Sequence, residues 1–113
     1  PVLVEFWATW CPLCEELAPR LEAVRRLAGD RLEILIIAVA VNQSPRAIRR
    51  HLARHPLPGR VLWDADGRAT RAFQAPTTSY VVVLDRTGRV VYTGVGGDQA
   101  LERPVAAVIG AGR

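Results

Sequence analysis

The sequence of 113 residues contains no methionine, no lysine and only two cysteines. Two cysteines are too few for a disulfide framework or a four-cysteine zinc site, so any cysteine chemistry must rest on one pair. The 15 basic residues are all arginine, and they are scattered along the chain rather than gathered with aromatic residues. Despite the net charge of +4, this pattern does not favour a nucleic-acid partner.

Long apolar segments are also missing. The longest apolar run, residues 34–41, is far too short to cross a membrane. No signal peptide is present, but the chain starts with Pro1 and enters a predicted strand at once. We therefore expect that a signal or anchor, and some N-terminal elements of the fold, are missing from this sequence.

The length and the balance of apolar and charged residues predict one soluble α/β domain over residues 1–113. Continuous apolar runs at 2–8 and 32–41 are typical of buried parallel strands, and apolar residues recur at helical spacing from 13 to 28. Strands and helices then alternate, which predicts a mixed central sheet with helices on both faces. The predicted elements are strands at 2–8, 32–41, 61–63, 80–84 and 90–93, and helices at 12–28, 45–55, 68–73 and 99–109.

The two cysteines, Cys11 and Cys14, stand where the first predicted strand passes into the first predicted helix. Pro12 suits the first position of a helix, which places Cys11 at the helix N-terminus. Unpaired N–H groups and the positive end of the helix dipole favour a thiolate there, and Cys14 is within reach to resolve a mixed disulfide. The rival interpretation is half of a metal site. Only His51 and His55 could complete it, and we interpret them as surface histidines.

Residues 4–14, Val-Glu-Phe-Trp-Ala-Thr-Trp-Cys-Pro-Leu-Cys, with Pro19 following, resemble the active-site segment of the thioredoxin superfamily. The sequence of this segment is most similar to that of the TlpA/ResA-like branch of bacterial extracytoplasmic thiol–disulfide oxidoreductases, or redoxins. Residues 75–78, Ala-Pro-Thr-Thr, resemble the cis-proline loop of that branch, and residues 85–90 resemble the turn that follows it. The resemblance covers nearly the whole chain. It implies a thioredoxin-like three-layer α/β/α sandwich and a cis bond before Pro76, which would align a bound peptide beside the cysteines.

The resemblance also implies an enzyme that exchanges the Cys11–Cys14 pair with protein dithiols or disulfides, with no cofactor besides this redox-active disulfide. The dipeptide between the cysteines contains no histidine, unlike that of strongly oxidising members, which favours a reductant of apocytochrome or other periplasmic cysteines. The expected partners are these protein substrates and a membrane electron donor of the thiol-relay type. We expect a periplasmic or otherwise extracytoplasmic monomer, with a cytoplasmic location as the alternative.

Glu5 is a carboxylate in an otherwise apolar strand, a costly position unless the group is functional or satisfied. By the resemblance it stands where thioredoxin has a buried acid beneath its active-site disulfide. Burial would raise the pKa of Glu5 towards neutrality and allow it to accept the proton of Cys14. The alternative is a strand-edge carboxylate that reaches solvent. A peptide-docking surface is expected from Trp7, Trp10, Pro12, Leu13, Ala75, Pro76 and Thr77.

Two other functions remain open. The first is a peroxide-reducing redoxin, although peroxidases usually carry Thr-x-x-Cys and here Thr9 lies only two residues before Cys11. The second is a copper-binding or other metal-binding module that uses Cys11 and Cys14. A copper chaperone would ordinarily add a histidine or methionine ligand, and the chain has no methionine. A peroxide-consumption assay and a metal-content measurement would separate these functions from thiol–disulfide exchange.

Overall fold

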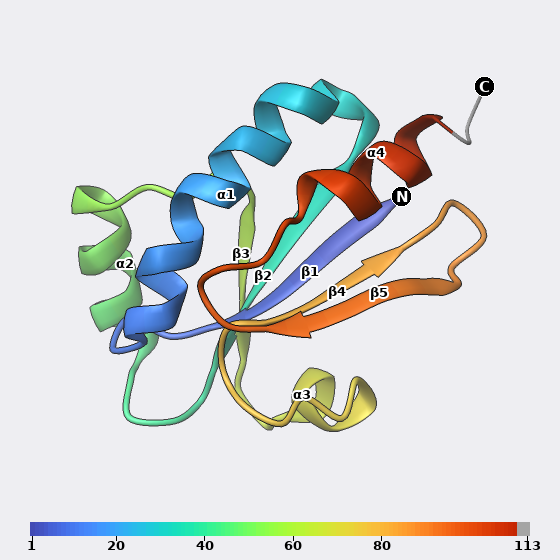
Figure 1. Cartoon of the computed structure of the whole chain (residues 1–113). Coiled ribbons are helices and arrows are strands. Elements are labelled where there is room, and N and C mark those ends of the chain that lie inside the picture. The colour runs from blue at the N-terminus through green and yellow to red at the C-terminus, as the bar shows by residue number, and fades with distance from the viewer. Residues whose placement is uncertain (111–113) are drawn as a thin grey trace.

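The computed structural model describes residues 1–110, which form a five-stranded mixed sheet with helices on both faces (Figure 1). The strands are β1 (Val2–Trp7), β2 (Glu33–Val39), β3 (Arg60–Asp64), β4 (Tyr80–Leu84) and β5 (Val90–Val95). The helices are α1 (Pro12–Ala28), α2 (Pro45–Arg54), α3 (Arg68–Ala72) and α4 (Glu102–Gly110), with a short 3-10 helix, Gly29–Arg31, after α1. The predicted α/β class is confirmed, while the predicted domain end at residue 113 lies outside the described residues.

The sheet has the order β3-β2-β1-β4-β5, which places β1 at its centre. The first three strands run parallel, and the pairs β1–β4 and β4–β5 are antiparallel. α1 and α4 lie on one side of the sheet and α3 lies on the other (Figure 1). Within residues 1–110, none of the helices has the length and apolar content that a membrane crossing requires.

α1 has the bounds that the sequence predicted. Pro12 occupies the first helical position, and the helix stops after Ala28 because Gly29 adopts a φ of +59°, which favours glycine. The buried residues recur at helical spacing and pack into the core beneath the helix. They are Cys14, Leu17, Leu21, Val24 and Ala28.

α4 begins at Glu102, three residues later than the predicted start at residue 99. Pro104 explains the late start, because a proline is tolerated in the first helical turn, where N–H groups have no intrahelical partner. Gln99 lies outside the helix, and its buried side chain donates hydrogen bonds to the carbonyls of Ser79 (3.0 Å) and Gly96 (2.7 Å). Gln99 therefore ties the segment before α4 to Ser79, the residue that precedes β4.

The loop before β4 departs from the expectation at Pro76. The described residues contain no cis peptide bond, so the predicted cis bond between Ala75 and Pro76 is wrong. The trans isomer is the intrinsically favoured one, by roughly 0.5–1 kcal/mol for a bond before proline. The loop turns at other positions, because Gln74 (φ +52°) and Ser79 (φ +64°) adopt left-handed backbone on either side. The N–H of Ser79 then donates to the carbonyl of Phe6 at 2.7 Å, which ties the loop to β1.

Candidate active site

Cys11 and Cys14 form a disulfide at the N-terminus of α1, with their Cα atoms 5.2 Å apart. Cys11 is the N-cap residue: its backbone is extended, and its sulfur accepts a hydrogen bond from the N–H of Cys14 at 3.1 Å. Its carbonyl accepts the N–H of Glu15 at 3.2 Å, so the helix begins at this residue. After reduction, the N–H of Cys14 and the positive end of the helix dipole would favour a thiolate on Cys11, the form that a nucleophile requires.

Glu5 lies in the middle of β1, between Ile36 of β2 and Val81 of β4 in the strand register. Trp7 and Cys14 line one small cavity, and side chains two residues apart on a strand point to the same face. Glu5 therefore faces the side of the sheet that carries the disulfide. It has no exposed surface, and neither carboxylate oxygen has a hydrogen-bond partner among residues 1–110.

Burial raises the pKa of Glu5 from an ordinary value of 4.5 to about 8. At neutral pH most of the population is therefore protonated. This pKa is close to that of an ordinary thiol, about 8.5, so proton exchange between Glu5 and the thiol of Cys14 needs little driving force. The structure thus places the three residues that the sequence predicted to be catalytic on the same side of the sheet.

Two side chains fix the reactive loop to the segment that follows β2. The amide oxygen of Gln43 accepts the N–H of Thr9 at 2.9 Å, and the amide nitrogen donates to the carbonyl of Val39 at 2.7 Å. The indole N–H of Trp10 donates to the carbonyl of Val41 at 2.8 Å. Sequence reasoning missed the role of Gln43. The available signal was a polar side chain directly after a buried parallel strand, at the edge where ligand sites form.

Most of the predicted docking residues lie on the outer surface. Trp10 and Leu13 are each 46% exposed although both are large and apolar, and Pro12 lies exposed between the cysteines. Pro76 and Thr77 are exposed on the loop before β4. The last of these residues, Ala75, is half-buried beside Pro76.

Trp7 differs from the other predicted docking residues because it is only 3% exposed. Its ring meets that of His51 edge-on, with centroids 5.6 Å apart, and the rings of His51 and His55 are 4.9 Å apart. His55 is exposed as predicted, whereas His51 is half-buried. Burial, together with the neighbouring His55, lowers the pKa of His51, and Glu15 opposes this shift.

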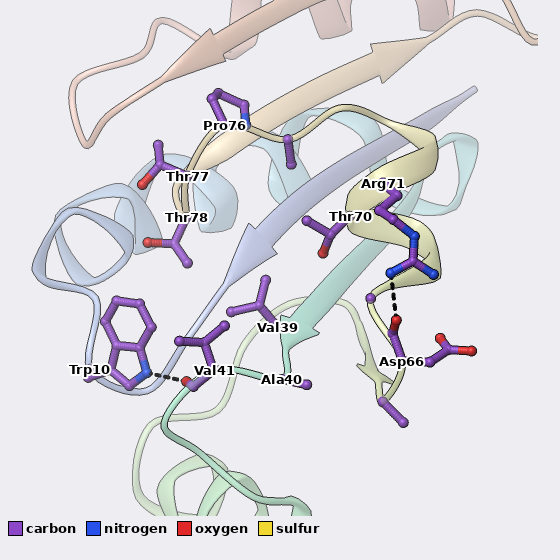
Figure 2. A pocket seen from close by; sticks show the side chains of 13 residues that line it. Trp10, Val39, Ala40, Val41, Asp66, Thr70, Arg71, Pro76, Thr77 and Thr78 are labelled. Carbon is purple, nitrogen blue, oxygen red and sulfur yellow. Dashed lines mark hydrogen bonds between the residues drawn. The ribbon is translucent and has the colours of Figure 1, made fainter.

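A pocket of about 530 Å³ lies between the reactive loop and the loop before β4 (Figure 2). Trp10 and Arg71 lie at opposite ends of it, and Val39 and Ala40, at the end of β2, lie between them (Figure 2). Pro76 is on its upper rim. Across residues 1–110, no three or more histidine, cysteine, aspartate or glutamate side chains are grouped as metal ligands would be.

The family described as Redoxin matches residues 1–109 of the chain. The ResA thiol-disulfide oxidoreductase of Halalkalibacterium halodurans is 28% identical over 98 residues, which cover 85% of this chain and 54% of that protein. Thioredoxin of Mycolicibacterium smegmatis is 47% identical over 49 residues, 43% of this chain and 44% of that protein. The chain thus spans about half the length of these relatives.

Solved structures agree on the architecture. A thioredoxin-like protein solved in its oxidised form superposes with a TM-score of 0.83 and is 26% identical. The matched part covers 97% of this chain and 78% of that protein. The thioredoxin-like fold predicted from the sequence is therefore confirmed.

Proposed function

The chain belongs to the redoxin family, in the TlpA/ResA-like branch of the thioredoxin superfamily, and we propose that it catalyses thiol–disulfide exchange with protein substrates. One observation carries the proposal: the Cys11–Cys14 disulfide caps α1 on the sheet face that holds a buried carboxyl without partners. An ordinary structural disulfide has no need of such an acid. A group that is costly to bury and unsatisfied is expected where chemistry requires it.

The reaction begins with the reduced pair. The thiolate of Cys11 attacks one sulfur of a substrate disulfide and expels the other as a thiolate, which leaves a mixed disulfide on Cys11. Glu5, in its ionised form, accepts the proton of the Cys14 thiol. The Cys14 thiolate then attacks the sulfur of Cys11 and releases the second substrate thiol. The substrate disulfide gains two electrons, and the Cys11–Cys14 disulfide forms.

In the reverse half of the cycle a dithiol donor reduces the Cys11–Cys14 disulfide. The protonated form of Glu5 then supplies the proton that the departing Cys14 sulfur takes up. The two directions use opposite protonation states of one carboxyl. A pKa of about 8 keeps both states accessible near neutral pH.

We further propose that the protein acts as a monomeric reductant outside the cytoplasm. Its substrates would be oxidised cysteines of periplasmic proteins such as apocytochromes, and a membrane thiol relay would supply its electrons. The support comes from the resemblance to an extracytoplasmic branch and from the absence of histidine between the cysteines.

A trapping experiment tests the exchange reaction. The reduced Cys14→Ser variant is mixed with a disulfide-bonded peptide, and the products are weighed by mass spectrometry. We expect a stable adduct on Cys11, because the serine cannot resolve it. The matched Cys11→Ser variant retains only Cys14, which lies inside α1 rather than at its N-cap, and should give little adduct. If neither variant forms an adduct, the proposed function is wrong, and peroxide consumption and metal content become the assays to pursue.

The equilibrium reduction potential against dithiothreitol and glutathione buffers tests the direction. A potential near or below about −250 mV, close to that of thioredoxin, supports a reductant. A potential above about −180 mV would make the protein an oxidant or isomerase. Fluorescence of the three tryptophans, one of which precedes Cys11, provides the signal.

A further inference from the structure

The exposed indole of Trp10 stands between two pockets, and both carry arginine side chains. The first is the pocket of about 530 Å³ that ends at Arg71 (Figure 2). The second, of about 410 Å³, lies towards α2 and is lined by Arg50 and Arg54 together with His51 and His55. Because Trp10 lines both pockets and directly precedes Cys11, both pockets adjoin the reactive segment.

The guanidinium of Arg71 is held by a backbone acceptor, and its charge helps to lower the pKa of Asp64. Its Nη1 donates to the backbone carbonyl of Asp66 at 2.8 Å, and no carboxylate within residues 1–110 forms a salt bridge with it. Asp64 interacts with Arg71 through charge, but its two oxygens accept their hydrogen bonds from Ala69 and Thr70 instead. Four of the five N–H donors of Arg71 therefore remain for a ligand, in the fork geometry that suits a carboxylate.

The second pocket is the more positive of the two, because its charged lining residues are arginines without an acid. Arg50 and Arg54 are exposed, and neither takes part in a salt bridge within the described part of the chain. The charged residues that line the two pockets are three arginines and one aspartate, Asp66. The Asp66 carboxylate accepts the N–H of Arg68 at 3.2 Å, which engages part of its hydrogen-bonding capacity. In the first pocket the charge of Arg71 is therefore balanced by that of Asp66, and Arg71 contributes its remaining N–H donors, while positive charge prevails in the second pocket.

We propose that these two pockets select polypeptide substrates whose reactive cysteine is flanked by acidic residues. This inference rests on the proposed thiol–disulfide exchange and names its substrate class. The carboxylates of the substrate pair with Arg71 on one side of Trp10 and with Arg50 and Arg54 on the other. Their apolar neighbours pack on the indole and on the wall formed by Val39 and Ala40. The long-range attraction also raises the rate of encounter, so the selection weakens as salt is added.

The test uses a set of disulfide-bonded peptides that share one sequence and differ only in the residues flanking the cysteine, which are acidic, neutral or basic. The second-order rate constant for oxidation of the reduced protein is measured at low and high salt. We expect the acidic peptide to react about tenfold faster than the basic one at low salt, and the ratio to shrink in high salt. Each of Arg71→Gln, Arg50→Gln and Arg54→Gln should reduce this ratio about two- to fivefold, the range of exposed ion pairs.

Arg68→Gln is the matched control, because Arg68 lies on the same short helix as Arg71 but lines neither pocket. It should leave the ratio unchanged, and all four variants should react with dithiothreitol as the parent protein does. Equal rates for acidic and basic peptides, or a preference for the basic one, would overturn the inference while leaving the exchange reaction intact. If no peptide reacts while dithiothreitol still reduces the disulfide, the proposed function itself fails.

Oxidised glutathione separates the two sources of carboxylate. It is a disulfide with carboxylates but without polypeptide flanks that could span both pockets. We expect it to react more slowly than the acidic peptide. A rate equal to that of the acidic peptide would overturn the assignment of a polypeptide substrate.

Discussion

Two carboxylates are buried in the same sheet, and they differ in their hydrogen-bond partners and in the direction of their pKa shifts. Glu5, in the middle of β1, has no exposed surface and no hydrogen-bond partner. Asp64, the last residue of β3, is 7% exposed and accepts hydrogen bonds from the N–H of Ala69 (3.0 Å) and from the N–H (3.0 Å) and hydroxyl (2.7 Å) of Thr70. Burial raises the pKa of both groups, but at Asp64 the bonds from Thr70 and Ala69 outweigh it and lower the pKa.

The difference teaches that donors, rather than burial alone, decide the charge of a buried acid. Asp64 stays ionised and organises the first turn of α3, so its role is structural. Glu5 keeps its proton at neutral pH and reduces stability whenever it loses it. Asp64 thus has hydrogen-bond donors for both of its oxygens, whereas Glu5, which faces the side of the disulfide, has none among the described residues.

The largest expected effect is on the pH dependence of folding. Between pH 4.5 and about 8 folded Glu5 holds a proton that the unfolded chain releases, so the free energy of unfolding falls as pH rises across this window. We expect a slope of roughly 1 kcal/mol per pH unit from this group, and the loss of this component in Glu5→Gln. Urea unfolding at a series of pH values measures both. An unchanged slope in Glu5→Gln would contradict the raised pKa.

Asp64 should act with the opposite sign. Its lowered pKa means that its contribution is complete above the ordinary value of 3.8 and is lost as pH falls through the folded-state pKa. Asp64→Asn should therefore remove stability near neutral pH and converge with the parent in acid, and the same unfolding series provides this comparison.

The next effect is on catalysis. Glu5→Gln should slow the oxidation of the reduced protein by a disulfide peptide about 100-fold at pH 7, because general base catalysis at Cys14 is lost. In the parent protein this rate should rise with pH through about 8, whereas reduction of the disulfide by a dithiol should lose its Glu5-assisted component over the same range. Stopped-flow fluorescence measures both directions. Asp64→Asn serves as the control, and an equal loss in both variants would assign Glu5 a structural role only.

A smaller effect concerns stability at one pH. Asp64→Ala leaves two N–H groups and one hydroxyl without their acceptor, and we expect it to lower the free energy of unfolding by about 2 kcal/mol at pH 7. Glu5→Leu removes a carboxyl that has no partner and should be neutral or stabilising. Denaturant midpoints compare the two. A loss at Glu5→Leu larger than that at Asp64→Ala would show that Glu5 has partners in solution.

The smallest effect sharpens the account of Asp64. Thr70→Val removes one of its three donors while keeping the shape of the side chain, and it should cost about 1 kcal/mol. Because this bond lowers the pKa of Asp64, the variant should also move acid unfolding to higher pH. The matched control is Thr93→Val on β5, an exposed threonine for which the structure gives no side-chain hydrogen bond. Equal costs for both substitutions would mean that the hydroxyl of Thr70 contributes nothing.

The two acids also mark how far the sequence could predict this molecule. A lone glutamate in an apolar run predicts burial or function, because the surrounding residues leave it no exposed face. The environment of Asp64 was not predictable, since its donors depend on how α3 folds back onto the end of β3. Local periodicity predicted α1 to the residue, because its apolar spacing and its proline and glycine boundaries all agree.

Contacts between residues far apart in the sequence could not be predicted either, because they also depend on how the elements pack. Trp10 and Arg71 are 61 positions apart in the sequence, and only the packing of the loops at the strand ends places them around one pocket. The isomer of the bond before Pro76 was predicted wrongly. Sequence similarity to a family does not determine it, because the free-energy difference between the cis and trans forms of such a bond is small. His51 was interpreted as a surface residue because its contact with Trp7 joins elements more than 40 positions apart.

The amide of Gln43 has a consequence for anyone who wishes to re-engineer this protein. Because it accepts the N–H of Thr9 and donates to the carbonyl of Val39, the reactive segment is held by a side chain that lies 34 positions beyond Thr9 in the chain. A segment from another protein that replaced residues 8–14 alone would lose its matched hydrogen-bond partner. The two segments that must be exchanged together are residues 8–14 and residues 39–43. A chimera that exchanges both should retain the position of its cysteines.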